Sequence, residues 1–305
     1  MERLHKIGQS WVPYFPSFLF QKRILTRTKK DMPIDSVLKQ ELKKWIIAFS
    51  NNLVLFLLTF LIVFLAHNAV LSFVGFFTGV KVNLNNFTIP FNSPNSSLSS
   101  IIFVFLSGPV TLLSLGIIFY SLFRVAKRKK GILKILFLWG YINSFNMLLA
   151  YMVIGLLTDS GFGEITWRLH FSDMMKIMLI FVSMLLIVLI GNSNSKYFYT
   201  TTFSRSFTET RRKRVMFIII ALLLPVVIGF GIFTLINYSS NSFYQQAVLI
   251  SLILLIIPSF RDKQAYTHIR LMRDPTKPGI VWGWVFVLAA LVCVYRFLLA
   301  FGIVF

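Results

Sequence analysis

The chain alternates between long apolar runs and short polar segments. Apolar runs of about 18 residues or more are long enough to cross the ~30 Å hydrocarbon core of a bilayer as helices. The sixth run, Ala247–Ile257, is short, because the polar pair Gln245 and Gln246 precedes it and Pro258 follows it. The pattern predicts an all-α polytopic membrane protein with about seven transmembrane helices. The seven runs are Trp45–Leu65, Ile101–Phe123, Ile132–Leu157, Met174–Gly191, Val215–Ile236, Ala247–Ile257 and Ile280–Phe305.

Composition agrees with this class. The 305 residues are 56% hydrophobic and only 13% charged, with a mean hydropathy of +0.76. A soluble protein of this length needs more charge to cover its surface, so a soluble fold is excluded. The single Cys293 cannot form an internal disulfide. We expect no cleaved signal peptide, because residues 1–44 are basic and contain prolines instead of a continuous apolar core.

The positive charges are unevenly distributed along the chain. Of 31 Lys and Arg residues, 27 lie in the segments 1–44, 124–134, 196–214 and 261–277. The polar segments between them are nearly uncharged, and the positive-inside rule assigns the basic ones to the cytoplasm. We therefore predict a cytoplasmic N-terminus, an external C-terminus and an integral protein of a bacterial cytoplasmic (inner) membrane.

A net charge of +21 could indicate a protein that binds nucleic acid. The basic segments lie next to the ends of apolar runs and have no interleaved glycine and aromatic residues, so we expect no nucleic-acid partner. Anionic lipid head groups are the expected partners at the cytoplasmic face, at ~1 kcal/mol per cation near the surface. The first 44 residues are interpreted as a basic amphipathic cytoplasmic or interfacial segment.

The segment AHNAVLSFVGFFTGVKV, which begins at Ala66, contains a histidine near the end of the first apolar run. A zinc hydrolase helix carries two histidines at positions i and i+4, with a glutamate beside the first as general base. His67 is the first of these positions here. Asn68 stands at the glutamate position and Leu71 at the second histidine position.

Three further motifs follow His67 in order: Gly-Val-Lys-Val at 79–82, Leu-Ser-Gly-Pro at 106–109 and Asp-Ser-Gly at 159–161. This order resembles the site-2 protease family of intramembrane zinc metalloproteases over about residues 46–165. The resemblance implies a three-helix core at 45–165 with an outer loop at 81–100, followed by four further transmembrane helices at 166–305. It also implies that His67 and Asp159 stand at two of the three metal-ligand positions of that family.

Two of the required groups are missing from that pattern. A leucine offers no lone pair to zinc, and an asparagine amide has no useful basicity, so we expect no catalytic residue and no bound cofactor. An alternative is an active metal-dependent protease with replacement ligands from Glu164, His170 or Asp173. A third interpretation is that His67 only hydrogen-bonds a neighbouring helix.

Three polar residues stand out within apolar runs. Asn143 and Asn146 are three residues apart, share one helix face and should point into the bundle. They either hydrogen-bond neighbouring helices or, as the resemblance implies, include an asparagine that binds a substrate strand. Arg296 costs about 2.5–3.5 kcal/mol if it lies at the bilayer centre, which makes it a candidate functional residue. It either extends toward the outer head groups or pairs with an acidic residue of the segment 159–173.

These observations favour a non-catalytic, pseudoprotease-like membrane protein that acts as a scaffold or binding subunit, with other membrane proteins as partners. Zinc enters only under the alternative of an active protease with rearranged ligands. A transporter is the second alternative. It is less favoured because no second half of the chain mirrors the first, as repeats do in many transporters.

Overall fold

The computed structural model describes residues 34–80, 97–126, 132–159, 161–199, 202, 205–236, 243–261 and 279–300. The chain divides into two compact units, Met1–Lys44 and Trp45–Phe305. The first unit is described only from residue 34. Four stretches named above lie outside the described residues: 1–33 of the basic N-terminal segment, 81–96 of the expected outer loop, and the basic stretches 127–131 and 262–278.

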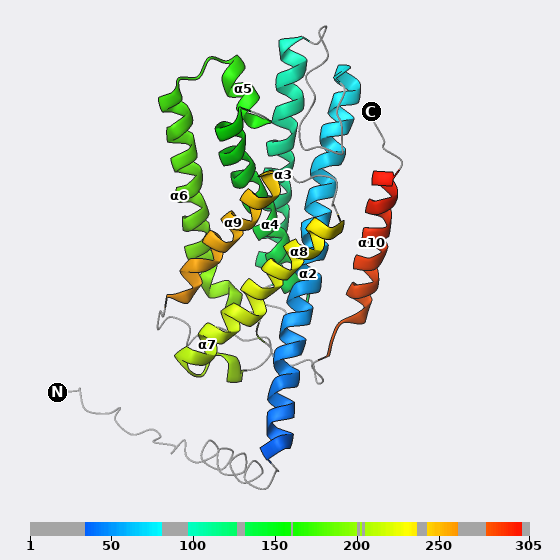
Figure 1. Ribbon diagram of the computed structural model, residues 1–305, viewed down its shortest axis with the longest axis vertical. Coiled ribbons are helices and arrows are strands. Elements are labelled where there is room, and N and C mark those ends of the chain that lie inside the picture. The colour runs from blue at the N-terminus through cyan, green and yellow to red at the C-terminus, as the bar shows by residue number, and fades with distance from the viewer. Residues whose placement is uncertain are drawn as a thin grey trace, which may run out of the picture. The chain divides into compact units, whose positions relative to one another are not determined.

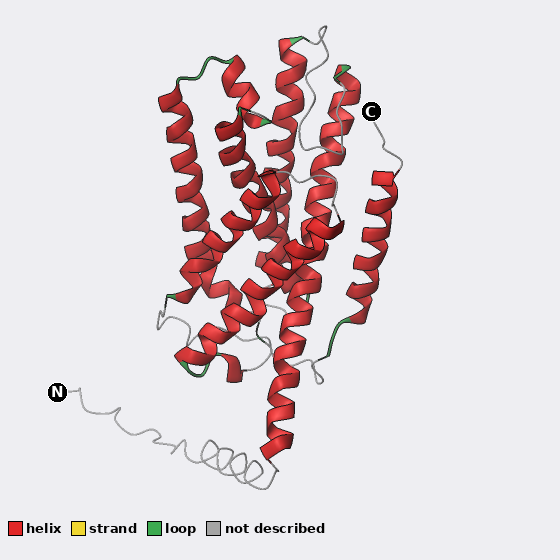
Figure 2. Ribbon diagram, viewed as in Figure 1, coloured by secondary structure: helices red, strands yellow, loops and turns green. Residues whose placement is uncertain are grey.

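Every regular element in the described part is a helix, and Figure 2 shows no strand there. Five helices, at Lys39–Thr78, Leu98–Ala126, Leu133–Thr158, Asp173–Phe198 and Arg211–Leu235, are long and apolar enough to cross a membrane. The length and composition of these helices fit a helical integral membrane protein. The elements in order are α2 Ile34–Thr78, α3 Leu98–Ala126, α4 Leu133–Thr158, α5 Phe162–Arg168, α6 Asp173–Phe198, η2 Arg205–Phe207, α7 Arg211–Ile218, η3 Ile219–Leu223, α8 Leu224–Ile236, α9 Phe243–Ile256, η4 Ile257–Phe260 and α10 Trp282–Ala300.

Helix α2 is longer than its apolar run predicted. The run was expected to end at Leu65, but the helix continues to Thr78. Apolar residues resume directly after the polar pair at 67 and 68, so nothing there stops the helix. It ends at Gly79, whose φ of 69° suits a residue without a Cβ, and Val80 N donates to Gly75 O at 3.0 Å to close the last turn.

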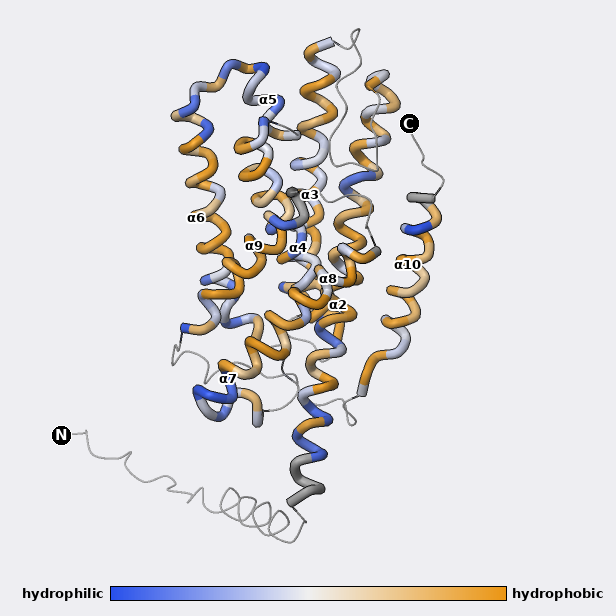
Figure 3. Tube along the Cα trace, viewed as in Figure 1, coloured by the Kyte–Doolittle hydropathy of each residue, from blue (hydrophilic) through white to orange (hydrophobic). Residues whose placement is uncertain are grey.

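Helix α4 is the central helix of the second unit. Its apolar window is 67% buried inside the protein, whereas that of α6 is only 17% buried. Figure 1 shows α4 behind α8 and α9, with α3 and α6 alongside. The hydropathy colouring of Figure 3 shows α6 as apolar over most of its length, as expected for a helix that faces lipid.

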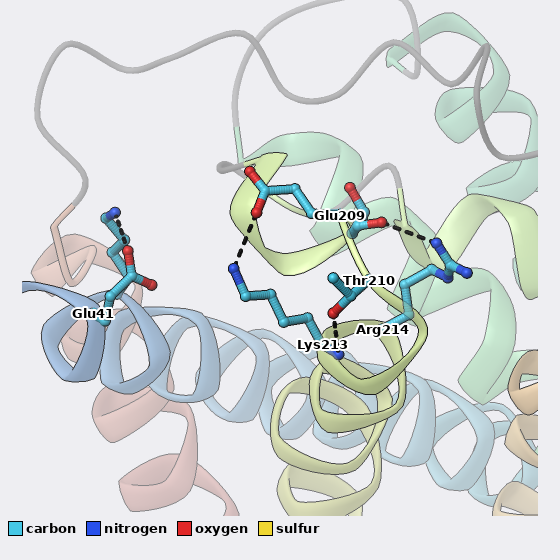
Figure 4. A network of polar contacts seen from close by, with 7 residues as sticks. Glu41, Glu209, Thr210, Lys213 and Arg214 are labelled. Atoms are coloured by element: carbon cyan, nitrogen blue, oxygen red, sulfur yellow. Dashed lines mark hydrogen bonds and ion pairs between the residues drawn. The ribbon is translucent and has the colours of Figure 1, made fainter. Parts of the chain in front are cut away.

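Helix α7 begins with four cations in a row, at 211–214. Thr210 caps it, because its hydroxyl accepts from the Lys213 backbone N–H at 3.3 Å. Lys213 also pairs with Glu209 at 3.0 Å, and Arg214 donates to the Thr208 carbonyl at 3.1 Å (Figure 4). These contacts fix the basic end of α7 where the chain enters its apolar run.

The helix then changes register. Residues 219–223 form a single π-helical stretch, and Pro225 follows at the second position of α8. Proline has no backbone N–H to donate to the preceding turn, and π turns are one way in which a helix accommodates such a break. The π-helical turn therefore lies immediately before Pro225.

Helices α8 and α9 meet near the middle of the bundle. The Phe233 ring lies 4.9 Å from that of Phe60 and 5.3 Å from that of Phe64 on α2. Val248, the sixth residue of α9, accepts from Asn146 at the midpoint of α4. About 12 residues of α4, or ~18 Å, extend beyond this level. Figure 1 likewise shows α8 ending and α9 beginning below the upper ends of α3 and α6.

Helix α10 stands at the edge of the bundle beside α2 (Figure 1). Hydrogen bonds and ring contacts hold it there. Asn51 of α2 donates to the Gly279 carbonyl and accepts from the Val281 N–H, both at 3.2 Å. Further along, the Tyr295 ring packs 5.8 Å from that of Phe64. Tyr295 is the one buried residue among the described side chains of α10.

Candidate functional site

The imidazole of His67 is enclosed by α3 and α4. Its side chain is only 6% exposed, and its ring lies 5.3 Å from the Tyr151 ring. A Cβ built on Gly108 would come within 2.7 Å of His67 Nε2, so only glycine leaves room for this nitrogen on α3. Nδ1 is buried and has no hydrogen-bond partner of ordinary geometry in the described part of the chain.

Asp159 lies in different surroundings. It caps the end of α4 in the left-handed conformation, with φ 47°, which Asp tolerates better than most residues. Its carboxylate is exposed and accepts from Lys176 Nζ at the start of α6. The side chain thus joins two helix ends through an ion pair.

The two positions that the resemblance assigned to a metal are therefore not brought together. Tyr151, which faces His67, precedes Asp159 by eight residues, or about 12 Å along α4. Within the described ranges, no three His, Cys, Asp or Glu side chains are grouped as ligands of one ion. Of the proposed replacement ligands, Glu164 accepts from Arg168 at 2.9 Å on the short helix α5. Among the described residues, His67, Asp159 and Glu164 therefore do not converge as the three protein donors of a catalytic zinc ion do.

The polar groups of α4 point to a different use. Trp139 Nε1 donates to Asn52 Oδ1 on α2 at 3.0 Å. Asn143 Nδ2 donates to Thr59 Oγ1 at 2.9 Å, also on α2. Both bonds are fully buried, and they tie α4 to α2 at two levels.

Two further bonds tie α4 to the helices on its other side. Asn146 Nδ2 donates to the Val248 carbonyl of α9 at 2.9 Å. The Tyr141 hydroxyl accepts from Asn194 Nδ2 of α6 at 3.1 Å. Asn143 and Asn146 thus make the interhelical hydrogen bonds that sequence reasoning offered as one of their two roles.

The side-chain amides of Asn143 and Asn146 donate hydrogen bonds through their nitrogens, whereas their oxygens accept none from the described residues. The Oδ1 atoms of Asn143 and Asn146 are buried and have no partner within the described ranges. The amide orientations follow from their neighbours, because the carbonyls of Phe56 and Val248 can only accept. Buried acceptors of this kind are usually satisfied by an ordered water or another donor.

Sequence reasoning missed the partners on the facing helices. Asn52 and Asn194 lie near the ends of apolar runs, where polar residues are common. Tyr141 counts as an apolar residue in a hydropathy pattern, so its hydroxyl was not recognised as a hydrogen-bonding group. Lys134 was counted with the cytoplasmic cations, yet its side chain is buried. Lys134, Asn143 and Asn146 all lie in one apolar run. Several polar residues in a single run are a signal of a polar interface between helices.

Arg296 lies on the exposed side of α10, one residue after the buried Tyr295. Sequence reasoning offered an acidic residue of 159–173 as one of two possible partners for it. Of these residues, Asp159 pairs with Lys176 and Glu164 pairs with Arg168.

Comparison of the chain with family models, with curated proteins and with solved structures gives no match.

Proposed function

We propose that this chain is a non-catalytic subunit or scaffold of a membrane protein complex that binds other membrane proteins and uses no zinc. The observation that supports it best is the separation of His67 from Asp159. One is enclosed between helices and the other joins two helix ends by an ion pair, so both positions have structural uses. The polar groups of α4 support the same view, because they hold helices together.

We also propose an orientation and a membrane topology. With the basic segments in the cytoplasm, the N-terminus lies inside and the C-terminus outside. Helices α2, α3, α4, α6 and α10 are proposed to cross the membrane. The pair α8–α9 is proposed to enter from the cytoplasm and turn back near the middle, so five of the seven apolar runs cross. A bacterial cytoplasmic membrane is the proposed location.

The test of the function is purification of the full chain in a mild detergent, with metal analysis, a protease assay and identification of stoichiometric membrane partners. The proposal expects a defined partner and less than about 0.1 zinc per chain, because a structural or catalytic zinc binds tightly enough to stay with the protein during purification. It also expects that a chelator leaves the amount of bound partner unchanged. One zinc per chain, with proteolysis that His67→Ala abolishes, would contradict it.

One observation favours a second candidate, a transporter. Helices that turn back within the membrane, with a π turn and a proline before the turn, are typical of the broken helices that form transporter sites. In the topology proposed above, the α7–α9 segment has this form, with its π turn at 219–223 and Pro225. Uptake of solute into vesicles that contain only this chain, lost when the α8–α9 turn is disrupted, would support this candidate over the scaffold.

A further inference from the structure

We propose that the first turn of α4, together with the side chain of Lys134, binds a phosphate group at the end of the bundle that the proposed topology places in the cytoplasm. The phosphate belongs either to the head group of an anionic phospholipid or to free inorganic phosphate, and both sources present the same kind of oxygen. The inference goes beyond the proposed scaffold function and does not depend on it.

Lys134 is a buried cation without a counter-charge. The residue is only 3% exposed, and its side chain forms no hydrogen bond or ion pair with any described residue. Lysine is almost never fully buried unless it is paired. Removing an ammonium group from water is costly, and a bound anion offsets that cost.

The start of α4 has backbone donors that no described side chain satisfies. Ile132 stands at the N-cap without a side-chain acceptor, and the first turn contains no acidic residue. The N–H groups of Ile135 and Leu136 donate to the Ile132 carbonyl at 2.9 and 3.2 Å. Those of Leu133 and Lys134 donate to no described residue. Free N–H groups at a helix N-terminus carry a partial positive charge and attract anions.

The lysine and the free backbone donors converge on one place. Lys134 is the second residue of α4, and helical side chains lean toward the N-terminus of their own helix. The lysine side chain therefore runs toward the N–H groups of the first turn. An ammonium group and backbone N–H groups at a helix start are the donors with which many proteins hold phosphate oxygens.

Lys134 lies on the face of α4 that packs against α3 and α6. Tyr141 is seven residues, or about two turns, further along the same face. Its hydroxyl accepts from Asn194 of α6 at 3.1 Å, and its ring lies 5.1 Å from the Tyr120 ring of α3. The lysine is thus enclosed at the end of a three-helix interface. Basic pockets between transmembrane helices at the cytoplasmic side are places where lipid head groups bind.

Two other cations at this end of the bundle have local explanations that Lys134 lacks. Arg124 and Lys196 lie in the last turns of α3 and α6, where a cation interacts favourably with the negative end of the helix dipole. Both are exposed, and Lys196 also lies 5.1 Å from the Tyr197 ring. Lys134 is instead buried at the positive end of a helix, where an anion balances both the ammonium group and the helix dipole.

The depth of Lys134 fits the phosphate level of a bilayer. It lies about 17 Å from the midpoint of the 26-residue helix α4, whereas the hydrocarbon core extends ~15 Å from its centre. For a helix centred in the bilayer, Lys134 is therefore just outside the hydrocarbon, among the head groups. The four basic residues at 127–130 attract anions to this end, but they lie outside the described residues and are not part of the proposed site.

The test measures binding to the full chain after removal of lipid in a neutral detergent. Phosphatidylglycerol and phosphatidylcholine are titrated separately, and the bound lipids are counted by native mass spectrometry. Inorganic phosphate is titrated by calorimetry, with chloride at the same ionic strength as the reference. The variants are Lys134→Met and Lys134→Arg, and Lys43→Met at an exposed lysine of α2 is the matched control.

We expect one saturable site per chain for phosphatidylglycerol, for inorganic phosphate or for both, and none for phosphatidylcholine or chloride. Lys134→Met should weaken binding about tenfold, equivalent to ~1.4 kcal/mol. Lys134→Arg should retain most of the affinity, and Lys43→Met should retain all of it. Binding of phosphatidylglycerol alone identifies a lipid head group as the ligand, and binding of inorganic phosphate identifies the free anion.

Thermal unfolding of the same variants separates a ligand site from a structural role. Methionine has about the length of lysine without its charge, so Lys134→Met should be at least as stable as the wild-type chain when no anion is present. Added anion should stabilise the wild-type chain and not the variant. Lys134→Gln serves the same purpose if the methionine variant does not fold.

Three results would overturn the inference: no saturable binding of either ligand, binding that Lys134→Met leaves unchanged, or an equal loss of binding with Lys43→Met. The last result would show attraction by net charge alone. None of them bears on the proposed scaffold function, which the partner and metal measurements test separately.

Discussion

Helices α4 and α10 are both apolar, yet they are held in opposite ways. Helix α4 is surrounded by neighbours and makes buried side-chain hydrogen bonds to α2, α6 and α9. Helix α10 contacts α2 and α8 on one side, through Tyr295 and several partly buried residues, and most of its described side chains are exposed. The two apolar helices therefore differ in their packing: α4 joins three other helices through buried polar contacts, and α10 is packed on one side only.

A glycine-to-alanine pair tests this comparison with the largest expected effect. A Cβ at Gly140 of α4 would lie 2.7 Å from the Phe119 ring, whereas a Cβ at Gly283 of α10 would meet nothing within 4 Å. Gly140→Ala should lower the free energy of unfolding by about 1–3 kcal/mol through overpacking. Gly283→Ala should leave it unchanged or raise it by at most ~1 kcal/mol. Unfolding by dodecyl sulfate in mixed micelles measures both, and equal effects would refute the contrast.

The same tryptophan substitution at two sites gives a smaller effect. Trp139 is buried and donates to Asn52, while Trp282 at the start of α10 is 62% exposed. Trp139→Phe should cost ~1–2 kcal/mol, because it leaves a buried amide oxygen without its donor. Trp282→Phe should change stability by less than ~0.5 kcal/mol. Unfolding in mixed micelles checks both, and a larger loss at 282 would mean that α10 is a structural helix.

The smallest effect on stability is expected where the chain before α10 is bonded to α2. Asn51→Ala removes both contacts to the chain before α10 and should reduce global stability by only ~0.5 kcal/mol, in the range measured for single polar contacts between membrane helices. It should nevertheless increase hydrogen exchange along α10 while the exchange of α4 stays unchanged. Faster exchange in α4 would show that the two regions are coupled.

Sequence periodicity predicted most of the helices, because hydrophobic length is the dominant constraint on a membrane chain. It could not predict the π-helical stretch at 219–223 or the break between α8 and α9, because hydropathy does not report the backbone geometry inside an apolar run. Helix α2 likewise ran past Leu65 because a histidine and an asparagine do not end a helix.

The candidate site was less predictable. The pairing of Asn143 and Asn146 with other helices followed from the cost of exposing amides to lipid, but their partners did not. Asn52 and Asn194 are recognisable only when the helices are assembled. The resemblance assigned His67 and Asp159 to one metal site. The structure places them apart, because α2 continues to Thr78, well beyond His67, whereas Asp159 caps the end of α4.

The most direct test of the account measures the amount of membrane partner that co-purifies with the full chain. The test variant combines His67→Ala with Asp159→Asn, and Met178→Leu on the exposed side of α6 is the control. The account predicts that both variants retain the partner in the amount found with the wild-type chain. Loss of the partner, together with loss of one bound zinc per chain, in the His67 and Asp159 variant alone would contradict the account.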